Sequence, residues 1–273
     1  MRPPLHVTDL DAYLIQPSQA EQEFARIFSK DAALVICDIG ACEGEDTVRY
    51  ALRYPLARVF AFEPLPANQQ LVRMHLAQYH ATNARLIPIA LSDRVGEARF
   101  HVSSGRPPGK PDDRNWNHGN KSSSLLPPAS DGPMHGWIEF KETITVPTGT
   151  LDEFCKAEKI SHIDFIQMDV QGAERLVLAG ATCMLPHITA IWLEVSSKEN
   201  YRGQSLDRDI SGFMAKHGFR LAYRTALGDG SGEGDHLYLN LRQPRVWPYL
   251  ALRSLRSLAG RVKRATLSSL IPG

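Results

Sequence analysis

A regular alternation of short apolar strands with helices, beginning near residue 34, constrains the fold of this chain more than any other feature. Strands are expected at residues 34–39, 58–62 and 85–90, and the intervening segments predict helices at 47–54 and 66–79. Strands that alternate with helices favour a doubly wound parallel sheet, and right-handed crossovers would place these two helices on one face.

The alternation stops after residue 90 and resumes at residue 151. Helices are expected at residues 151–159, 173–179 and 206–217, and strands at 163–168, 189–195, 219–224 and 236–241. The last two strands are expected to form an antiparallel pair at the end of the sheet. The whole pattern predicts an α/β, Rossmann-like fold with seven main strands and helices on both faces.

An inserted hairpin is expected where the alternation stops. Residues 96–102 alternate apolar and polar side chains, and residues 142–146 can return as their antiparallel partner. Between them, residues 103–140 contain 11 Gly or Pro, and so long an irregular segment is usually a functional lid or a disordered insertion. Trp116 and Trp137 favour a lid, in which they would either stack on a ring of a ligand or pack against the protein.

Charge is unevenly distributed, although the formal net charge is only +1. Residues 236–273 contain seven basic and no acidic residues, whereas the rest of the chain contains 24 basic and 30 acidic residues. An acidic body does not favour binding to nucleic acid. Three parts are therefore expected: a helical lead-in at residues 1–31, a main domain at 32–241 and a basic amphipathic tail at 242–273.

The tail admits two interpretations. Residues 245–270 place leucines among arginines, which is typical of a basic amphipathic helix lying on an anionic membrane or a partner, or of a helix docked on its own domain. No apolar run is long enough to span a membrane, and the N-terminus lacks the apolar core of a secretory signal. We expect a cytoplasmic protein with four reduced cysteines, peripheral to a membrane if the tail binds one.

The first candidate site is the turn after the first strand, which has the sequence Asp38-Ile39-Gly40-Ala41-Cys42-Glu43-Gly44. Its glycines let the backbone approach a ligand, and the N–H groups of the following helix face that ligand. The spacing differs from the G-x-G-x-x-G turn of dinucleotide-binding proteins, and an acid at the strand end suits a cationic amine better than a diphosphate. The alternative is a glycine turn that only starts the helix.

Polar residues also follow the next two strands. Glu63, before Pro64, ends the second strand, where a carboxylate can accept two hydrogen bonds from a ribose diol. Ser92 and Asp93 follow the third strand and can contact an adenine amino group, although Ser-Asp is also ordinary turn chemistry. Because open α/β sheets bind ligands at the carboxyl ends of their strands, we expect Asp38 and Glu63 to face one crevice.

Several candidates for acid–base chemistry come later in the chain. Asp169 follows the strand at 163–168 and can orient a substrate hydroxyl, act as a base or help to hold a metal. Glu174 is a second candidate, although an acid there also stabilises a helix N-terminus. Glu194 ends the next strand, and His236 begins the last one.

Taken together, these blocks resemble the FkbM family of S-adenosylmethionine-dependent methyltransferases. The resemblance rests on Val35-Ile36-Cys37-Asp38-Ile39-Gly40-Ala41, Val59-Phe60-Ala61-Phe62-Glu63-Pro64, Ile89-Ala90-Leu91-Ser92-Asp93, Ser123-Ser124-Leu125, Thr150-Leu151-Asp152, Met168-Asp169-Val170-Gln171-Gly172-Ala173-Glu174 and Leu193-Glu194-Val195. It departs from the family where Cys42-Glu43 follows Gly-Ala, so we expect Glu43 to point away from the cofactor, and where Gln171 replaces the commoner Glu.

The resemblance implies a seven-stranded Rossmann-like fold and methyl transfer to oxygen, often on sugars or secondary metabolites. By position it assigns Asp38, Gly40, Ala41 and Gly44 to the amino acid part of the cofactor, Glu63 and Pro64 to the ribose, and Ser92 and Asp93 to the adenine, with Asp169 beside them.

The expected function is therefore an S-adenosylmethionine-dependent O-methyltransferase with a hydroxylated small molecule or glycan as acceptor. Asp169 is the first candidate for the base, followed by Glu174, Glu194 and His236. A divalent metal that assists deprotonation is a further option. The alternative function is a non-catalytic nucleoside-binding or scaffold module with the same fold.

Overall fold

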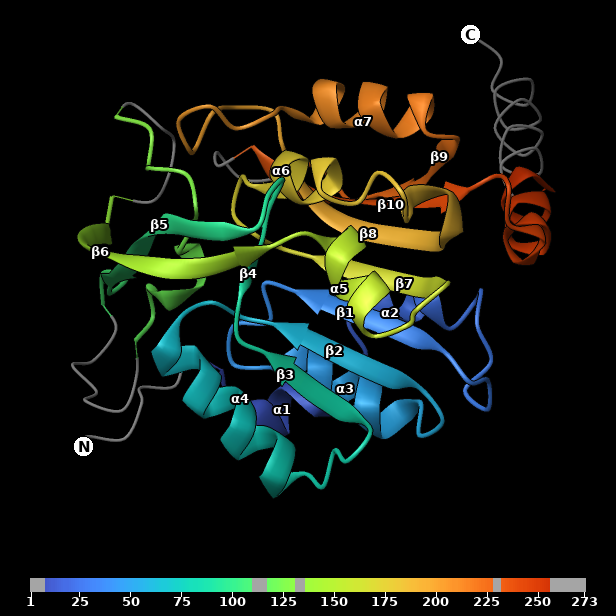
Figure 1. The fold of residues 1–273 in the computed structure, drawn as a ribbon, viewed down its shortest axis with the longest axis horizontal. Helices are drawn as coiled ribbons and strands as arrows, with labels where there is room; N and C mark the ends of the chain where they lie inside the picture. Colours follow the sequence, from blue (N-terminus) through green and yellow to red (C-terminus); the bar gives the residue numbers. More distant parts are fainter. Residues whose placement is uncertain (1–7, 110–116, 131–135, 228–231, 256–273) are drawn as a thin grey trace, which may run out of the picture.

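A computed structural model of the chain describes residues 8–109, 117–130, 136–227 and 232–255. Its main sheet has seven strands in the order β3-β2-β1-β7-β8-β10-β9, which Figure 1 shows side by side. The strands are β1 (Val35–Ile39), β2 (Arg58–Phe62), β3 (Ala84–Ile87), β7 (Ile163–Met168), β8 (Ile188–Ser196), β9 (Phe219–Arg224) and β10 (Glu233–Asn240). The first five run parallel, and β10 is antiparallel to both β8 and β9. This arrangement confirms the predicted α/β fold.

The third strand is shorter than predicted. It ends at Ile87, directly before Pro88, which has no N–H to continue the ladder. Ala90–Leu91 forms a separate strand, β4, which pairs in parallel with β6 (Ile138–Gly149) in a second sheet of order β4-β6-β5. The prediction of one strand over residues 85–90 is therefore wrong at its carboxyl end.

The inserted hairpin is present and longer than expected. β5 (Gly96–Gly105) pairs antiparallel with β6, and Figure 1 shows the two strands projecting beyond the ends of the main strands. Residues 117–130, which include the short helix η1 (Asn120–Ser122), return to β5. There His101 N donates to Ser124 O over 2.8 Å. Part of the expected irregular segment is thus strand, and Trp116 lies outside the described residues.

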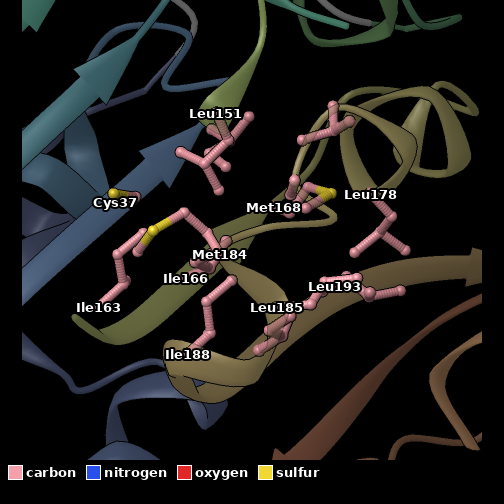
Figure 2. Packing of buried hydrophobic residues seen from close by; sticks show 14 of the residues in the cluster. Cys37, Leu151, Ile163, Ile166, Met168, Leu178, Met184, Leu185, Ile188 and Leu193 are labelled. Carbon is pink, nitrogen blue, oxygen red and sulfur yellow. The ribbon is translucent and has the colours of Figure 1, made fainter. Parts of the chain in front are cut away.

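Helices cover both faces of the main sheet. Their bounds are α1 (Leu10–Ile15), α2 (Gln19–Phe24), α3 (Glu45–Arg53), α4 (Pro66–Gln78), α5 (Leu151–Ala157), α6 (Glu174–Ala179) and α7 (Asp207–Lys216). Because side chains alternate along a strand, Cys37 and Ile39 of β1 pack on the side of α5, α6 and α7, in the cluster of Figure 2. Ile36 packs on the opposite side, with α2 and α3.

The expected lead-in packs into this second face. Ser18 caps α2 by accepting a hydrogen bond from Glu21 N over 3.1 Å, and Phe24 at the end of that helix is fully buried. The Phe24 ring lies 4.6 Å from the Tyr54 ring and 4.8 Å from the Phe165 ring, centroid to centroid. The N-terminal helices therefore share a hydrophobic core with the sheet.

The described beginning of the tail docks on its own domain. Val246, Tyr249 and Leu250 are buried in the same cluster as α2, and the Tyr249 hydroxyl donates to Glu23 over 2.5 Å. The rest of the predicted amphipathic segment lies outside the described residues. Across the described ranges, no helix combines the length and the apolar character that a membrane crossing requires.

Candidate active site

Gly40 forms the tight junction between β1 and the following turn. Its φ is +87°, and a Cβ at this position would lie 1.9 Å from the backbone oxygen of Asp169. The N–H groups of Gly40 and Ala41 both donate to Phe62 O over 3.0 Å, which ties the turn to β2. The turn ends at Gly44, with φ +80°, which is the N-cap of α3. Only glycine fits at Gly40 without displacing the carboxyl end of β7.

Glu63 extends from the end of β2 beneath this turn. One carboxylate oxygen accepts a hydrogen bond from Cys42 N, and the other accepts one from Leu65 N, each over 2.8 Å. Burial raises the pKa of Glu63 to about 8, although these two donors favour the ionised form. The Asn68 side chain is a third donor to this carboxylate. Because a carboxylate has about four acceptor positions, Glu63 retains capacity for a ligand.

Glu63 lines a cavity that is partly open to solvent and has about 530 Å³ of empty space, part of which is that open solvent. Apolar side chains from β2, β4, β5 and the loop of residues 117–130 form most of its wall, including Phe62, Leu91, Phe100 and Leu125. Its polar lining includes Asn68 and Asn120, which hydrogen-bond to each other over 2.5 Å. We call this the apolar cavity.

A second cavity, which we call the acidic cavity, adjoins the first. Its lining residues are Tyr13, Asp38, Gly40, Ala41, Cys42, Glu45, Asp46, Lys121, Gln167 and Asp169. Gly40, Cys42, Lys121 and Asp169 line both cavities, so these four residues mark the junction. Glu45 Oε2 is buried and has no hydrogen-bond partner among the described residues. An unsatisfied buried carboxylate oxygen favours a cationic or hydrogen-bond-donating ligand here.

Asp38 and Glu63 therefore line two adjoining cavities. Asp38 is in register with Ala61 of β2 and Gln167 of β7, and its carboxylate accepts from the Thr47 hydroxyl over 2.5 Å. Burial, reinforced by the nearby Asp46, raises the pKa of Asp38 well above its ordinary value. A cation bound beside Asp38 would stabilise the deprotonated form of its carboxyl group.

Asp169 lies at the junction directly after β7. Its backbone N–H donates to Ile39 O over 2.9 Å, and its carboxylate accepts from the Gln171 side chain over 2.7 Å. Burial raises the pKa of Asp169, while the Gln171 hydrogen bond and the positive charge of Lys121 oppose that rise. Lys121 in turn forms an ion pair with Glu45, which raises the pKa of the lysine despite its burial.

The other three acid–base candidates lie outside both cavity linings. Glu174 accepts from Val170 N and Gly172 N, each over 3.2 Å, and so supports the loop that carries Asp169. Burial raises the pKa of Glu174 to about 7. Glu194 contacts the site indirectly, because it accepts from the Gln171 side chain over 2.9 Å.

His236 lies farther along the sheet. Its Nδ1 is 3.0 Å from the Tyr238 hydroxyl, and burial lowers its pKa. It is in register with Leu193 of β8 and Arg224 of β9, and it does not line either cavity. The structure therefore brings Asp38, Glu63 and Asp169 together at the strand ends and leaves His236 apart from them.

Ser92 and Asp93, which were predicted to contact adenine, directly follow two residues of the cavity wall in the sequence. Ala90 and Leu91 line the apolar cavity, as does Pro64, whereas Ser92 and Asp93 do not. The Ser92 hydroxyl donates to Asp93 over 3.2 Å. Glu43 also faces elsewhere, since its carboxylate accepts from Thr8 N over 3.2 Å.

Seven polar residues of the lining were not predicted from the sequence: Tyr13, Glu45, Asp46, Asn68, Asn120, Lys121 and Gln167. A signal existed for two of them, because Asn120 and Lys121 begin the polar run that continues into the Ser123-Ser124-Leu125 block. In the described portion of the chain, no three His, Cys, Asp or Glu side chains are grouped so that they could hold a metal ion.

Comparison with known proteins agrees with this geometry. The sequence profile described as "Methyltransferase FkbM domain" matches residues 38–221. The 2-O-methyltransferase NoeI of Sinorhizobium fredii is 36% identical over 170 residues, which cover 62% of this chain and 66% of NoeI. The AMB antimetabolite synthetase AmbE of Pseudomonas aeruginosa is 27% identical over 269 residues, covering 88% of this chain and 13% of AmbE. The chain therefore spans just under two thirds of NoeI and a small part of AmbE.

One solved structure that matches this chain is the precorrin-6y C5,15-methyltransferase of Geobacter metallireducens. It shares 14% identity with this chain, with a TM-score of 0.42, and the alignment covers 87% of this chain and 98% of that one. The family match extends over most of the chain and contains the turn, the carboxylates and the strand ends described above. The chain belongs to the FkbM methyltransferase family.

Proposed function

We propose that this chain transfers a methyl group from S-adenosylmethionine to a hydroxyl of a sugar, a glycan or a secondary metabolite. The observation that carries the proposal is the position of Asp169, which lines the apolar and the acidic cavity at their junction. Adenosine in the first cavity and methionine in the second would bring the sulfonium to that junction. The name of NoeI, a 2-O-methyltransferase, supports oxygen as the acceptor atom.

The residues present fit this cofactor. Apolar walls suit an adenine ring, and Glu63 retains capacity to accept a hydrogen bond from the ribose diol. The carboxylates of Asp38 and Glu45 suit the ammonium group of the methionine part. Gly40, which has no side chain, keeps the backbone turn close to the ligand.

When bound, the cofactor supplies an electrophilic methyl group on a cationic sulfur. The chain's own part is to hold the acceptor oxygen in line with the methyl carbon and the sulfur, and such alignment accounts for much of the acceleration in displacements of this kind. Asp169 is the proposed base and accepts the proton of the acceptor hydroxyl at its carboxylate. A general base typically contributes about 10²–10⁴-fold.

Asp169→Asn tests this assignment. We expect the methylation rate to fall by about 10²–10⁴-fold while S-adenosylhomocysteine binding and melting temperature change little. Labelled methyl donor, incubated with fractionated glycans, lipids and small metabolites and followed by mass spectrometry, identifies the acceptor. A variant with intact turnover and an altered melting temperature would assign Asp169 to folding instead.

The same incubation distinguishes the non-catalytic alternative. Calorimetry that detects S-adenosylhomocysteine binding without methyl transfer to any acceptor fraction would favour a nucleoside-binding module. A divalent metal as an additional group is tested by adding a chelator to the active enzyme. Loss of activity that returns with one cation would add a metal to the proposal.

We further propose a peripheral contact through the helical residues 247–255. Trp247, Leu252 and Leu255 are 54%, 48% and 64% exposed, although neighbouring side chains of the same helix are buried. Exposed apolar side chains beside arginines suit an anionic membrane. Co-sedimentation with anionic vesicles should decrease after Trp247→Ala and Leu255→Ala together, and equal binding of intact and substituted protein would contradict this proposal.

A further inference from the structure

The side chain of Gln171 lies between two carboxylates at the carboxyl edge of the sheet. Its Nε2 is 2.7 Å from Asp169 Oδ1 and 2.9 Å from Glu194 Oε2, and its Oε1 accepts from the Tyr201 hydroxyl over 2.9 Å. A primary amide has two N–H donors at one end and an acceptor at the other. The opposite orientation would turn the amide oxygen toward two carboxylates, so the surroundings select this one.

The backbone of Gln171 is held in an unusual conformation. Its φ is +54°, and that of the following Gly172 is +91°. Positive φ is uncommon for residues other than glycine and persists where surrounding contacts enforce it. Here the Gln171 carbonyl accepts from the Ser124 hydroxyl over 2.7 Å, and the Tyr201 hydroxyl also contacts Ser122 O over 2.7 Å. The loop of the inserted hairpin thus secures the residue.

The charges around this bridge are mostly negative. Glu194 faces Asp169, Glu233, Glu174 and Asp235, and Tyr201 is close to it. Asp169 faces the cation of Lys121 and the carboxylate of Glu45. Burial raises the pKa of both Asp169 and Glu194. Without donors, two carboxylates this close would not both remain ionised.

We infer that Gln171 is a positioning residue that donates one N–H to Asp169 and the other to Glu194, and so keeps the Asp169 carboxylate ionised and fixed at the cavity junction. This inference rests on the proposed function for its catalytic meaning. Gln171 lines the apolar cavity but not the acidic one, and the contact assigned here is with the Asp169 carboxylate. The same bridge makes the ionisation of Asp169 depend on Glu194.

The direct test is the titration of Asp169 by carbon-detected NMR of protein labelled at aspartate carboxyls, with Asp169→Asn to assign the signal. Gln171→Glu removes both donors and adds a carboxylate, so the Asp169 midpoint should move upward by about one pH unit or more. Gln171→Leu removes the donors, and the acceptor for Tyr201, without adding a charge, so it should move the midpoint upward by less. Gln78→Glu, at an exposed position of α4, makes the same charge change and should leave it in place.

Activity supplies a second readout. In Gln171→Glu, the acid limb of the kcat profile should move upward with the NMR midpoint. Tyr201→Phe keeps the amide but removes its partner at Oε1, so it should produce a smaller shift in the same direction. This variant also serves if Gln171→Glu does not fold.

The outcomes separate this inference from the proposed function. An Asp169 midpoint that is unchanged in folded Gln171→Leu and Tyr201→Phe overturns the role of Gln171, whatever the enzyme does. A shifted midpoint in a protein that methylates no acceptor fraction supports the bridge and overturns the proposed function. A shifted midpoint with an unmoved kcat limb would leave Gln171 coupled to Asp169 but remove Asp169 as the base.

Discussion

Gly40 packs against Asp169 so closely that the backbone oxygen of Asp169 occupies the space of a Cβ, 1.9 Å from where that atom would lie. The contact joins the end of β1 to the residue after β7, and these two strands are neighbours in the sheet. The turn that would hold the cofactor and the proposed base are therefore positioned by one backbone contact.

Gly40→Ala should destabilise the protein by about 3 kcal/mol or more, because the new methyl meets backbone and φ is +87°. Urea denaturation measures the change. Gly212→Ala is the matched control: Gly212 is exposed within α7, and a Cβ there meets nothing within 4 Å. That substitution should stabilise by about 0.5–1 kcal/mol, and equal effects at both positions would contradict the close contact.

Glu63→Ala should weaken S-adenosylhomocysteine binding by about 10- to 100-fold at pH 9, since hydrogen bonds to a charged group contribute about 1.5–3 kcal/mol. In the native protein, affinity should rise as pH increases through about 8, where the pKa of Glu63 lies and its carboxylate ionises. Calorimetry across pH 6–9 measures both effects.

The pH dependence should disappear in Glu63→Ala and persist in Glu97→Ala, which changes an exposed residue of β5. An analogue of the ligand that lacks the ribose hydroxyls should bind equally well whether Glu63 is protonated or ionised. Native affinity that does not change between pH 6 and pH 9 would remove Glu63 from the ligand contact.

Glu174→Gln should preserve methyl transfer, because Glu174 supports the loop through Val170 N and Gly172 N and lies outside the cavities. Its folded pKa is raised from 4.5 to about 7. The native protein should therefore lose stability as pH rises from about 4.5 through about 7, by as much as about 3 kcal/mol. Thermal denaturation should show that the stability of Glu174→Gln, relative to the native protein, is greater at pH 8 than at pH 5. Glu142→Gln, at an exposed position of β6, should show no such gain.

Asn68 and Asn120 should be energetically coupled, because Asn120 Nδ2 donates to Asn68 Oδ1 over 2.5 Å in a buried setting. A double-mutant cycle with both alanine substitutions should give about 0.5–1.5 kcal/mol of coupling. If the stability losses of the two single substitutions add up to that of the double substitution within about 0.3 kcal/mol, the hairpin loop does not contact α4 in solution.

The sequence predicted the main sheet well because each strand combines a short apolar run with a turn. Residues 58–62, 163–168 and 219–224 were predicted with the bounds that β2, β7 and β9 have in the structure. β3 ends earlier than its apolar content predicts because Pro88, which the sequence contains, interrupts the ladder.

The candidate site was harder to predict, since it depends on which way side chains and loops point, and periodicity does not specify this. A period of two says that His236 and Tyr238 share a face, but it does not say whether that face holds the cavities. The path of the loop at residues 117–130 follows no repeat, so the polar run that contains Lys121 did not show that this side chain reaches the strand ends. Asp169 was recognisable because it follows a strand directly.

The position of β10 in the sheet also affects when the chain can complete its folding during synthesis. β10 is the last strand along the sequence, yet it lies between β8 and β9 and bonds to both. On the ribosome, β8 therefore keeps an unpaired edge until the nascent chain has passed Asn240, and an unpaired edge is a template for aggregation. Messages truncated before Glu233 should yield insoluble fragments, and a chaperone that shields strand edges would act on this protein late in its synthesis.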